Sequence, residues 1–230
     1  MARRVEGLGL TSGAIEKVIF DDDARCSLIG NVVPVGMCGS GLIDLAAEML
    51  NCGIIASTGR LVPSDELDSG IPDPIKKRVY QNCDGQMEFL VFQESTSRKD
   101  LRVAVTQKDI RELQLAVGAI RAGINIMLRK TSTKTENIKH IFIAGGFGSF
   151  IRRTNAQRIG LSPSKMDHQK IACVGNTSLN WAKWALLSTN VRKKAEEIAE
   201  KTSHIQFLLT TGFKRSLRMR CFFLTANKAN

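Results

Sequence analysis

Three glycine-bearing turns, each directly before a predicted helix, constrain this sequence more than any other feature. They lie at residues 36–41, 145–148 and 175–176. A helix N-terminus presents unpaired N–H groups and a partial positive charge, and glycine lets the backbone approach a phosphate or a ribose without a Cβ in the way. Three such turns in one domain favour a nucleotide-binding protein. The alternative is a set of tight connecting turns that bind no ligand.

Strand and helix patterns alternate along the chain. Strands are predicted at residues 12–20, 87–92, 101–105, 138–144, 171–174 and 205–209. Helices are predicted after the first turn up to residue 53, and at residues 106–130, 155–160, 177–187 and 191–202. The Ile-Phe-Ile core of residues 138–144 is typical of a strand buried on both faces of a parallel sheet. The alternation predicts an α/β fold with a mostly parallel sheet.

The helix ends carry recognisable signals. Thr106 and Asp109 have the spacing of a capping box, and Ser40 and Gly53 stand where an N-cap and a C-terminal stop are expected for the first helix. Glycines also occur inside the helix at residues 106–130, where each costs about 1 kcal/mol relative to alanine. They indicate either a ligand or backbone close by, or ordinary tight helix packing.

Composition bounds the organisation of the chain. With 43% hydrophobic residues over 230 positions, it can bury a core in one or two domains. Residues 57–84 are polar and contain three of the five prolines, so we expect a long excursion on the surface. The net charge of +11 would suit nucleic acid, but aromatic residues make up only 6%, and we do not expect a nucleic-acid partner.

The cysteines and histidines predict no metal site. The six cysteines include no C-x-x-C pair, so zinc, iron–sulfur and thioredoxin-type sites are not expected. Free thiols suit a reducing compartment, and no apolar run is long enough to span a membrane, so we expect a cytoplasmic protein without a membrane contact. Cys38, at a helix start, is a candidate reactive thiol, and the other five cysteines are expected to be buried and inert.

Two common nucleotide motifs are excluded or incomplete. The pattern G-x-x-x-x-G-K-[ST] does not occur, which excludes the P-loop class. The turn at residues 145–148 follows a strand as a Rossmann fingerprint would, but Ile151 stands where the third glycine should be.

Five segments in order carry a family resemblance. They are GMCGSGLIDLAAEMLNCGII (36–55), VTQKDIRELQLAVGAIRAGINIML (105–128), HIFIAGGFGSFI (140–151), NAQRIGLSP (155–163) and VGNTSLNWA (174–182). Together they resemble the C-terminal ATPase domain of the reductive activators of corrinoid proteins, in the acetate and sugar kinase/Hsp70/actin superfamily. The resemblance implies an α/β actin-like ATPase (ribonuclease H-like) fold over residues 1–213. Residues 214–230 are expected to form a basic tail of unknown structure, outside the resemblance.

The resemblance also implies a site and its ligands, ATP and Mg²⁺. It places the adenosine-side loop at Gly145, Gly146, Phe147 and Gly148, a nearby helix start at Gly175 and Asn176, and a cleft-lining loop at Gly36, Gly39, Ser40 and Gly41. The helix from Thr106 would help to wall the nucleotide. Lys108, Asp109 and Arg121 either contact the nucleotide or belong to a solvated helix face. No catalytic residue is identified.

The implied function is the ATP-binding module of an activator that couples ATP to reduction of cob(II)amide to cob(I)amide. Its partner would be a corrinoid protein or a corrinoid-dependent methyltransferase system, and the alternative of a homodimer stays open. The family's [2Fe–2S] cluster has no ligands here, and the superfamily's first phosphate loop is missing, so we expect a fragment that is incomplete at the N-terminus. The alternatives are a docking or dimerisation module without ATP turnover, and a small-molecule kinase of the same superfamily.

Overall fold

The computed structural model describes residues 3–4, 11–30, 32–96, 99–145, 147–163, 166–207 and 223. Its strands are β1 (Arg3–Arg4), β2 (Ala14–Phe20), β3 (Ala24–Leu28), β4 (Gly36–Met37), β5 (Val79–Gln81), β6 (Met87–Thr96), β7 (Lys99–Thr106), β8 (Ile141–Ala144) and β9 (Ile171–Gly175). Its α-helices are α1 (Gly39–Asn51), α2 (Asp73–Lys76), α3 (Gln107–Lys130), α4 (Arg153–Arg158), α5 (Thr177–Leu187) and α6 (Thr189–Lys201). Short 3₁₀ turns lie at Ser64–Glu66, Thr135–Asn137, Phe147–Phe150 and His168–Lys170.

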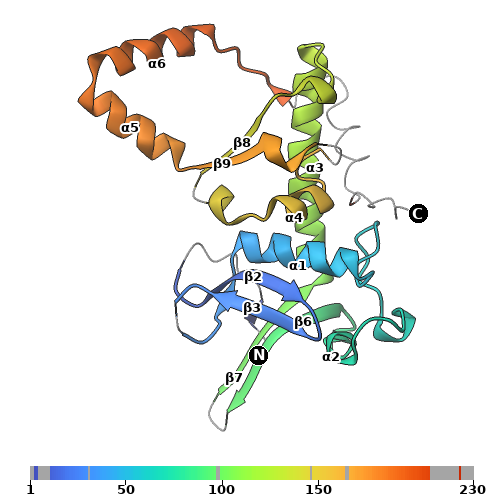
Figure 1. Cartoon of the computed structure of the whole chain (residues 1–230). Coiled ribbons are helices and arrows are strands. Elements are labelled where there is room, and N and C mark those ends of the chain that lie inside the picture. The colour runs from blue at the N-terminus through green and yellow to red at the C-terminus, as the bar shows by residue number, and fades with distance from the viewer. Residues whose placement is uncertain are drawn as a thin grey trace.

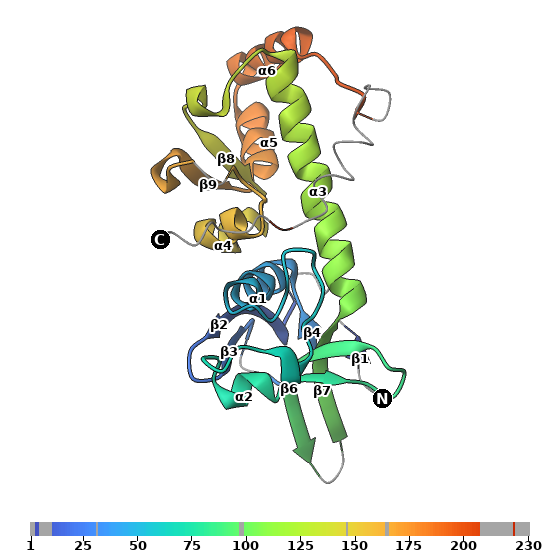
Figure 2. The same ribbon diagram turned by 90° about the vertical axis from the view of Figure 1, so that its right-hand side faces the viewer.

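Helix α3 joins two regions of the molecule (Figures 1 and 2). Its 24 residues span about 36 Å at 1.5 Å per residue. The α1 region, at the first half of α3, contains β1 to β7, α1, α2 and α4. The β8–β9 region, at the second half, contains β8, β9, α5 and α6.

The strands form three small sheets instead of one mostly parallel sheet. One sheet has the order β1-β7-β6-β5, a second β3-β2-β4, and β8 and β9 form the third. The pairs β2–β3, β5–β6 and β6–β7 are antiparallel, whereas β1–β7, β2–β4 and β8–β9 are parallel. The expectation of a mostly parallel sheet was wrong because three pairs of consecutive strands are joined by short connections, which place neighbouring strands antiparallel.

The α1 region holds the main hydrophobic core. Helix α1 lies on β2, and its apolar face buries Ile43, Leu45 and Met49. On the other side of this core, Phe89 of β6 is fully buried and stacks on Phe20 of β2 with ring centroids 5.5 Å apart. Burial of side chains of this size contributes roughly 1.5–3 kcal/mol each. This core therefore accounts for most of the apolar burial in the described chain.

The β8–β9 region has a much thinner core. Its cluster consists of Ala122 and Ile126 of α3, with Ile205 and Phe207 packed against them. Helices α5 and α6 contain no buried residue. Phe142 of β8 is 64% exposed, so the prediction of a strand buried on both faces was wrong. Among the described residues, β8 pairs only with β9, and no second layer covers the face that bears this ring.

The helix ends follow local signals, with one exception. Thr106 caps α3, and Thr106 and Asp109 form the predicted capping box. Helix α1 ends at the predicted stop, where Gly53 has φ +78° and the N–H of Ile54 donates to the carbonyl of Met49 as in a Schellman motif. Its start differs from the prediction, because Cys38 and not Ser40 is the N-cap.

Residues 57–84 are anchored in the core and do not simply lie on the surface. The buried apolar side chains of this segment are Leu61, Ile71, Ile75 and Val79. The sequence did not predict that these side chains are buried, because they are widely spaced in a polar segment and separated by turns.

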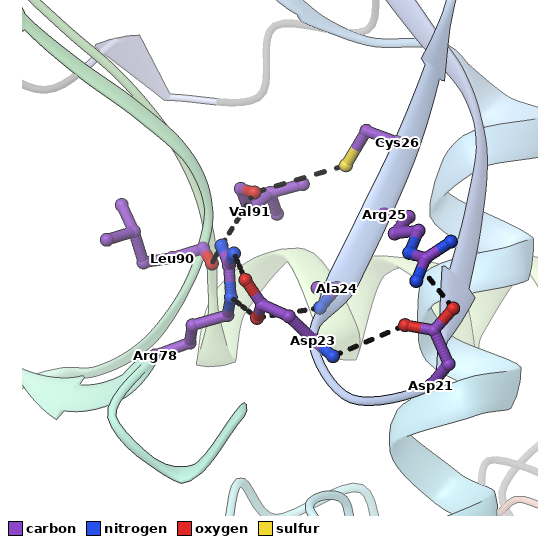
Figure 3. A network of polar contacts seen from close by, with 8 residues as sticks. All are labelled: Asp21, Asp23, Ala24, Arg25, Cys26, Arg78, Leu90 and Val91. Atoms are coloured by element: carbon purple, nitrogen blue, oxygen red, sulfur yellow. Dashed lines mark hydrogen bonds and ion pairs between the residues drawn. The ribbon is translucent and has the colours of Figure 1, made fainter. Parts of the chain in front are cut away.

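Arg78 fixes the end of this segment to two strands (Figure 3). Its Nε and Nη2 each donate to a carboxylate oxygen of Asp23 at 2.6 Å, and its Nη1 donates to the carbonyls of Leu90 and Val91 at 3.1 and 3.0 Å. This bidentate pairing lowers the pKa of Asp23 through the hydrogen bonds from Arg78. The turn between β2 and β3 is thereby tied to β6.

The strand predicted at residues 205–209 is not observed where the chain is described. Ile205 and Gln206 adopt no regular structure, and residues 208 and 209 lie outside the described residues. Phe207 explains Gly123 of α3, because a Cβ added there would lie 3.1 Å from the phenylalanine ring. Tight packing with a side chain, and not a ligand, accounts for this interior glycine. In the basic tail only Phe223 is described; it is buried, and its N–H donates to the carbonyl of Ser57.

Candidate functional site

Two of the three glycine turns meet at the carboxyl ends of β8 and β9. The strands are parallel, with Ile141 paired to Ile171 and Ala144 to Gly175. Directly after the pairing ends, the N–H of Gly145 donates to the carbonyl of Gly175 at 2.7 Å. Carboxyl ends of parallel strands are the usual position of ligand sites in α/β folds. The structure therefore brings these two predicted turns into one place.

Both glycines need their special backbone conformation. Gly145 has φ +100° and Gly175 has φ +67°, which L-residues with a Cβ rarely adopt. A Cβ added at either position would meet no atom within 4 Å. Backbone shape therefore requires glycine here, while the space beside each Cα is open. A phosphate or sugar could approach the main chain on this side.

The rest of the second loop is partly described. Gly148 is buried, and a Cβ added there would lie 2.6 Å from Cγ2 of Ile143, so this glycine permits the loop to fold back on β8. Gly146 lies outside the described residues, as does the side chain of Phe147. Their expected contacts with adenosine stay predictions.

Helix α5 adds its N-terminus to the meeting point. Asn176 is the N-cap, and its side-chain oxygen accepts a hydrogen bond from the N–H of Leu179 at 3.1 Å. This confirms the predicted helix start. The eleven-residue helix directs its unpaired N–H groups and its positive dipole end toward the glycine turns. An anion at this position would be stabilised.

The turn at residues 36–41 is occupied by packing. A Cβ added at Gly41 would collide with the backbone oxygen of Ile15, so glycine allows α1 to lie directly on β2. Ser40 is fully buried and donates to the carbonyl of Glu16 at 3.0 Å. The thiol of Cys38 lies 3.1 Å from the Ser40 hydroxyl and donates to the carbonyl of Ile15. The side chains of this loop thus face β2, as does the position of a Cβ at Gly41.

The remaining residues of this turn are also enclosed. Gly36 is paired with Ala14 in the β2–β4 ladder and is buried, whereas Gly39 is half-buried. The structure supports a close helix–strand contact as the role of Gly41. A contact between this loop and a nucleotide stays a prediction.

An ion pair between a buried carboxylate and a partly buried arginine, which sequence reasoning missed, connects α1 to the end of the second loop. Arg152 follows the 3₁₀ turn Phe147–Phe150, and its Nε donates to Asp44 at 2.9 Å. Its Nη2 donates to the carbonyl of Val18 at 2.5 Å and to Glu48 at 3.2 Å. Asn155 donates to the same Asp44 oxygen at 2.8 Å. The loop is therefore held at its start by β9 and at its end by α1 and β2.

The sequence did contain a signal for this pair. Asp44 is fully buried between apolar neighbours on α1, and buried carboxylates require a partner. An acid inside an apolar helix stripe thus indicates a distant cation. The other oxygen of Asp44, Oδ2, is buried and has no hydrogen-bond partner among the described residues.

Helix α3 does not bring its charged residues to the glycine turns as a group. Asp109 is used in the capping box, and Lys108 is exposed. Arg121 is buried and lines a separate cavity, discussed below. A nucleotide contact by these three residues stays a prediction.

The cysteines are free wherever they are described. Burial raises the pKa of Cys26 to about 11 and also raises the pKa of Cys52, which favours the protonated, unreactive thiol. Cys83 is exposed, so the expectation that every cysteine other than Cys38 is buried was wrong. Within the described ranges, no group of three or more His, Cys, Asp or Glu could hold a metal ion. In the same ranges no helix is long and apolar enough to cross a membrane.

The fold is that of an ASKHA domain, with the actin-like α/β architecture. The chain belongs to the family described as the C-terminal domain of RACo, the ASKHA domain, whose model matches residues 5–230. A solved structure named "Reductive activator for corrinoid,iron-sulfur protein" matches 93% of this chain with a TM-score of 0.79 and 35% identity, and 33% of that chain is covered.

Two characterised relatives have related names. "Corrinoid activation enzyme RamQ" of Eubacterium limosum is 33% identical over 226 residues, covering 95% of this chain and 37% of RamQ. "[Co(II) methylated amine-specific corrinoid protein] reductase" of Methanosarcina barkeri is 29% identical over 110 residues, covering 48% of this chain and 20% of that protein. The chain thus spans about a third of the length of RamQ and of the solved activator.

Proposed function

We propose that this chain is the ATP-binding module of a reductive activator of corrinoid proteins, and that ATP binds at the paired turns of Gly145 and Gly175. The observation that carries the proposal is the hydrogen bond between these two turns beside the N-terminus of α5. It places open glycine backbone and a positive helix end together, and both suit the phosphate or ribose part of a nucleotide.

The residues of the chain would bind and orient the nucleotide. Backbone N–H groups at the start of α5 can donate to phosphate oxygens, and the open side of Gly145 allows close approach. The Asp44–Arg152 pair keeps the second loop in position. Mg²⁺ would accompany ATP on its phosphates, but the described residues provide no acidic cluster for it, so we assign no Mg²⁺ ligand and no catalytic residue.

Coupling to the corrinoid would be conformational. The solved activator and RamQ are named as corrinoid activators, and we propose that this chain serves a corrinoid protein in the same way, supporting reduction of cob(II)amide to cob(I)amide. ATP can drive this step only if it binds two conformations of the activator with different affinities. Electron transfer is not assigned to any residue here.

A second candidate, a docking or dimerisation module without ATP turnover, has an observation of its own. Helix α5 exposes large apolar side chains, including Leu187 at 83% and Trp184 at 53%. Exposed apolar groups of this size indicate a surface that contacts another protein. The two functions are compatible, because α5 begins at the glycine turns and carries the apolar groups further along.

Calorimetric titration of the chain with Mg-ATP tests the first function. Gly145→Ala adds one Cβ into the open space at a positive-φ residue, and we expect ATP affinity to fall at least about tenfold, or roughly 1.4 kcal/mol. Gly53→Ala is the matched control, because Gly53 also has positive φ and open space but lies at the end of α1. Absence of binding to the unmodified chain, or equal loss in both variants, would contradict the proposal.

A further inference from the structure

A cavity of about 530 Å³ lies at the opposite end of β8 and β9 from the glycine turns. Among its lining residues, Glu136 precedes β8, and Asp167 and Lys170 precede β9. Since the two strands are parallel, these residues mark their amino ends. Figure 1 shows both strands starting beside α3 and ending on the side where α5 begins. The cavity is therefore separate from the proposed nucleotide site.

One wall of the cavity is a face of α3. Arg121, Ile124, Asn125 and Leu128 line it at helical spacing, so they lie on one side of the helix. Arg121 is only 9% exposed, which makes it a rare buried cation. A guanidinium has five N–H donors, so it can bind a carboxylate in addition to contacts within the protein.

The opposite wall is held in a fixed shape. Leu161, Pro163 and Met166 contribute apolar atoms to it. The buried amide of Gln157 donates to the carbonyls of Pro163 and Met166 at 3.0 and 2.6 Å, which fixes this wall beside α4. A cavity of this volume, with both polar and apolar lining residues, lies in the range of small-molecule sites.

The hydroxyl of Ser162 is the observation that indicates a missing ligand. It is 6% exposed and lines the cavity, and its hydroxyl oxygen is buried without a hydrogen-bond partner among the described residues. A buried hydroxyl with no partner is unfavourable and indicates a group that completes the hydrogen bond. Glu136 and Asp167, in contrast, are exposed. The enclosed part of the cavity thus presents a cation and a hydroxyl donor, and the acidic groups stand at its rim.

We infer that this cavity is a second ligand site, which takes a small organic anion with a carboxylate group and an apolar body. The carboxylate pairs with Arg121 and accepts a hydrogen bond from Ser162. The apolar body packs between Ile124 and Leu128 on one side and Met166 on the other. The inference does not depend on nucleotide binding by the glycine turns.

The test compares 2-naphthoate with 2-naphthylmethanol, a neutral molecule of similar shape, by NMR titration of the full chain. We expect saturable shifts at Ile124 and Leu128 and at least about tenfold tighter binding of the anion, since a charge-assisted hydrogen bond is stronger than a neutral one. Failure of both compounds to bind at millimolar concentration overturns the inference. Equal affinity of the two compounds overturns the assignment of a carboxylate ligand.

Two variants identify the residues responsible. Arg121→Gln should abolish the preference for the anion while binding of 2-naphthylmethanol persists, which shows that the cavity is still formed. Arg129→Gln, which removes an exposed arginine of the same helix outside the cavity, is the matched control and should keep the preference. Equal effects of the two substitutions would overturn the role of Arg121. Gly145→Ala should leave naphthoate binding unchanged, and its loss there would overturn the separation of the two sites.

Discussion

The α1 region and the β8–β9 region differ in how their helices are held. Helix α1 buries eight of its thirteen residues against β2 and its neighbours, whereas α5 and α6 bury none. All the ion pairs found among the described residues also involve the α1 region. Yet the paired glycine turns belong to the β8–β9 region. The proposed site therefore lies at the edge of the less packed β8–β9 region. Its second loop is held in position by contacts with the better packed α1 region.

The largest expected effect on stability separates two alanine substitutions, one in each region. Phe89→Ala removes a fully buried ring from the main core, and we expect the free energy of unfolding to fall by about 3–5 kcal/mol through lost burial and a cavity. Leu187→Ala removes an 83% exposed side chain of α5, and we expect a change within about 0.5 kcal/mol.

Urea denaturation followed by far-ultraviolet circular dichroism measures both variants. Both tryptophans, Trp181 and Trp184, lie on α5, so their fluorescence reports the β8–β9 region separately. A large loss in Leu187→Ala would show that α5 is packed in solution and would remove the contrast between the regions.

The second prediction concerns the pair that joins the two regions. Arg152→Leu leaves the carboxylate of Asp44 buried with Asn155 as its remaining donor, and we expect a loss of about 3 kcal/mol because an uncompensated buried charge is costly. Arg60→Leu is the control, since the Arg60–Glu66 pair is exposed and should contribute no resolvable stability.

This pair also predicts a local effect. Without Arg152, the end of the second glycine loop loses its attachment to α1 and β2, so amide hydrogen exchange at residues 145–150 should become faster than in Arg60→Leu. Unchanged exchange in these residues would mean that the pair stabilises α1 but does not hold the loop.

The local elements of this fold could be predicted from the sequence, and most of the long-range contacts could not. The capping box at Thr106, the stop at Gly53 and the start of α5 at Asn176 depend on residues close together in the chain. Asp44 and Arg152 are 108 positions apart, and no local pattern pairs them. Whether Phe142 is covered depends on the neighbouring layer and not on the strand itself.

The candidate site divides in the same way. The pattern of glycine before a helix predicted the turns at Gly145 and Gly175. Their proximity follows from the parallel pairing of β8 and β9, which the structure shows. The same signal at residues 36–41 has a different cause, because Gly41 lies against the backbone of Ile15. Glycine allows close approach in both cases, but the sequence does not say whether a ligand or a strand approaches.

The smallest predicted effect is a pH dependence that belongs to the α1 region. Hydrogen bonds from Arg78 lower the pKa of Asp23 below its ordinary value of 3.8, so the folded state favours the ionised carboxylate. The resulting stability is complete above about pH 3.8 and is lost as the pH falls through the lowered pKa. Because Asp23 is partly exposed, solvent screening keeps the effect small.

Asp23→Asn isolates this contribution, since asparagine keeps an acceptor for Arg78 but does not titrate. We expect the urea midpoint to fall less between pH 6 and pH 3 in this variant than in the unmodified chain, by circular dichroism. Asp22→Asn, at the exposed neighbouring position, controls for loss of one negative charge and should retain the full pH dependence. If both variants retained the full pH dependence, the acid sensitivity would have to arise from other carboxylates. The network in Figure 3 would then connect β6 to the β2–β3 turn without contributing to the pH dependence of stability.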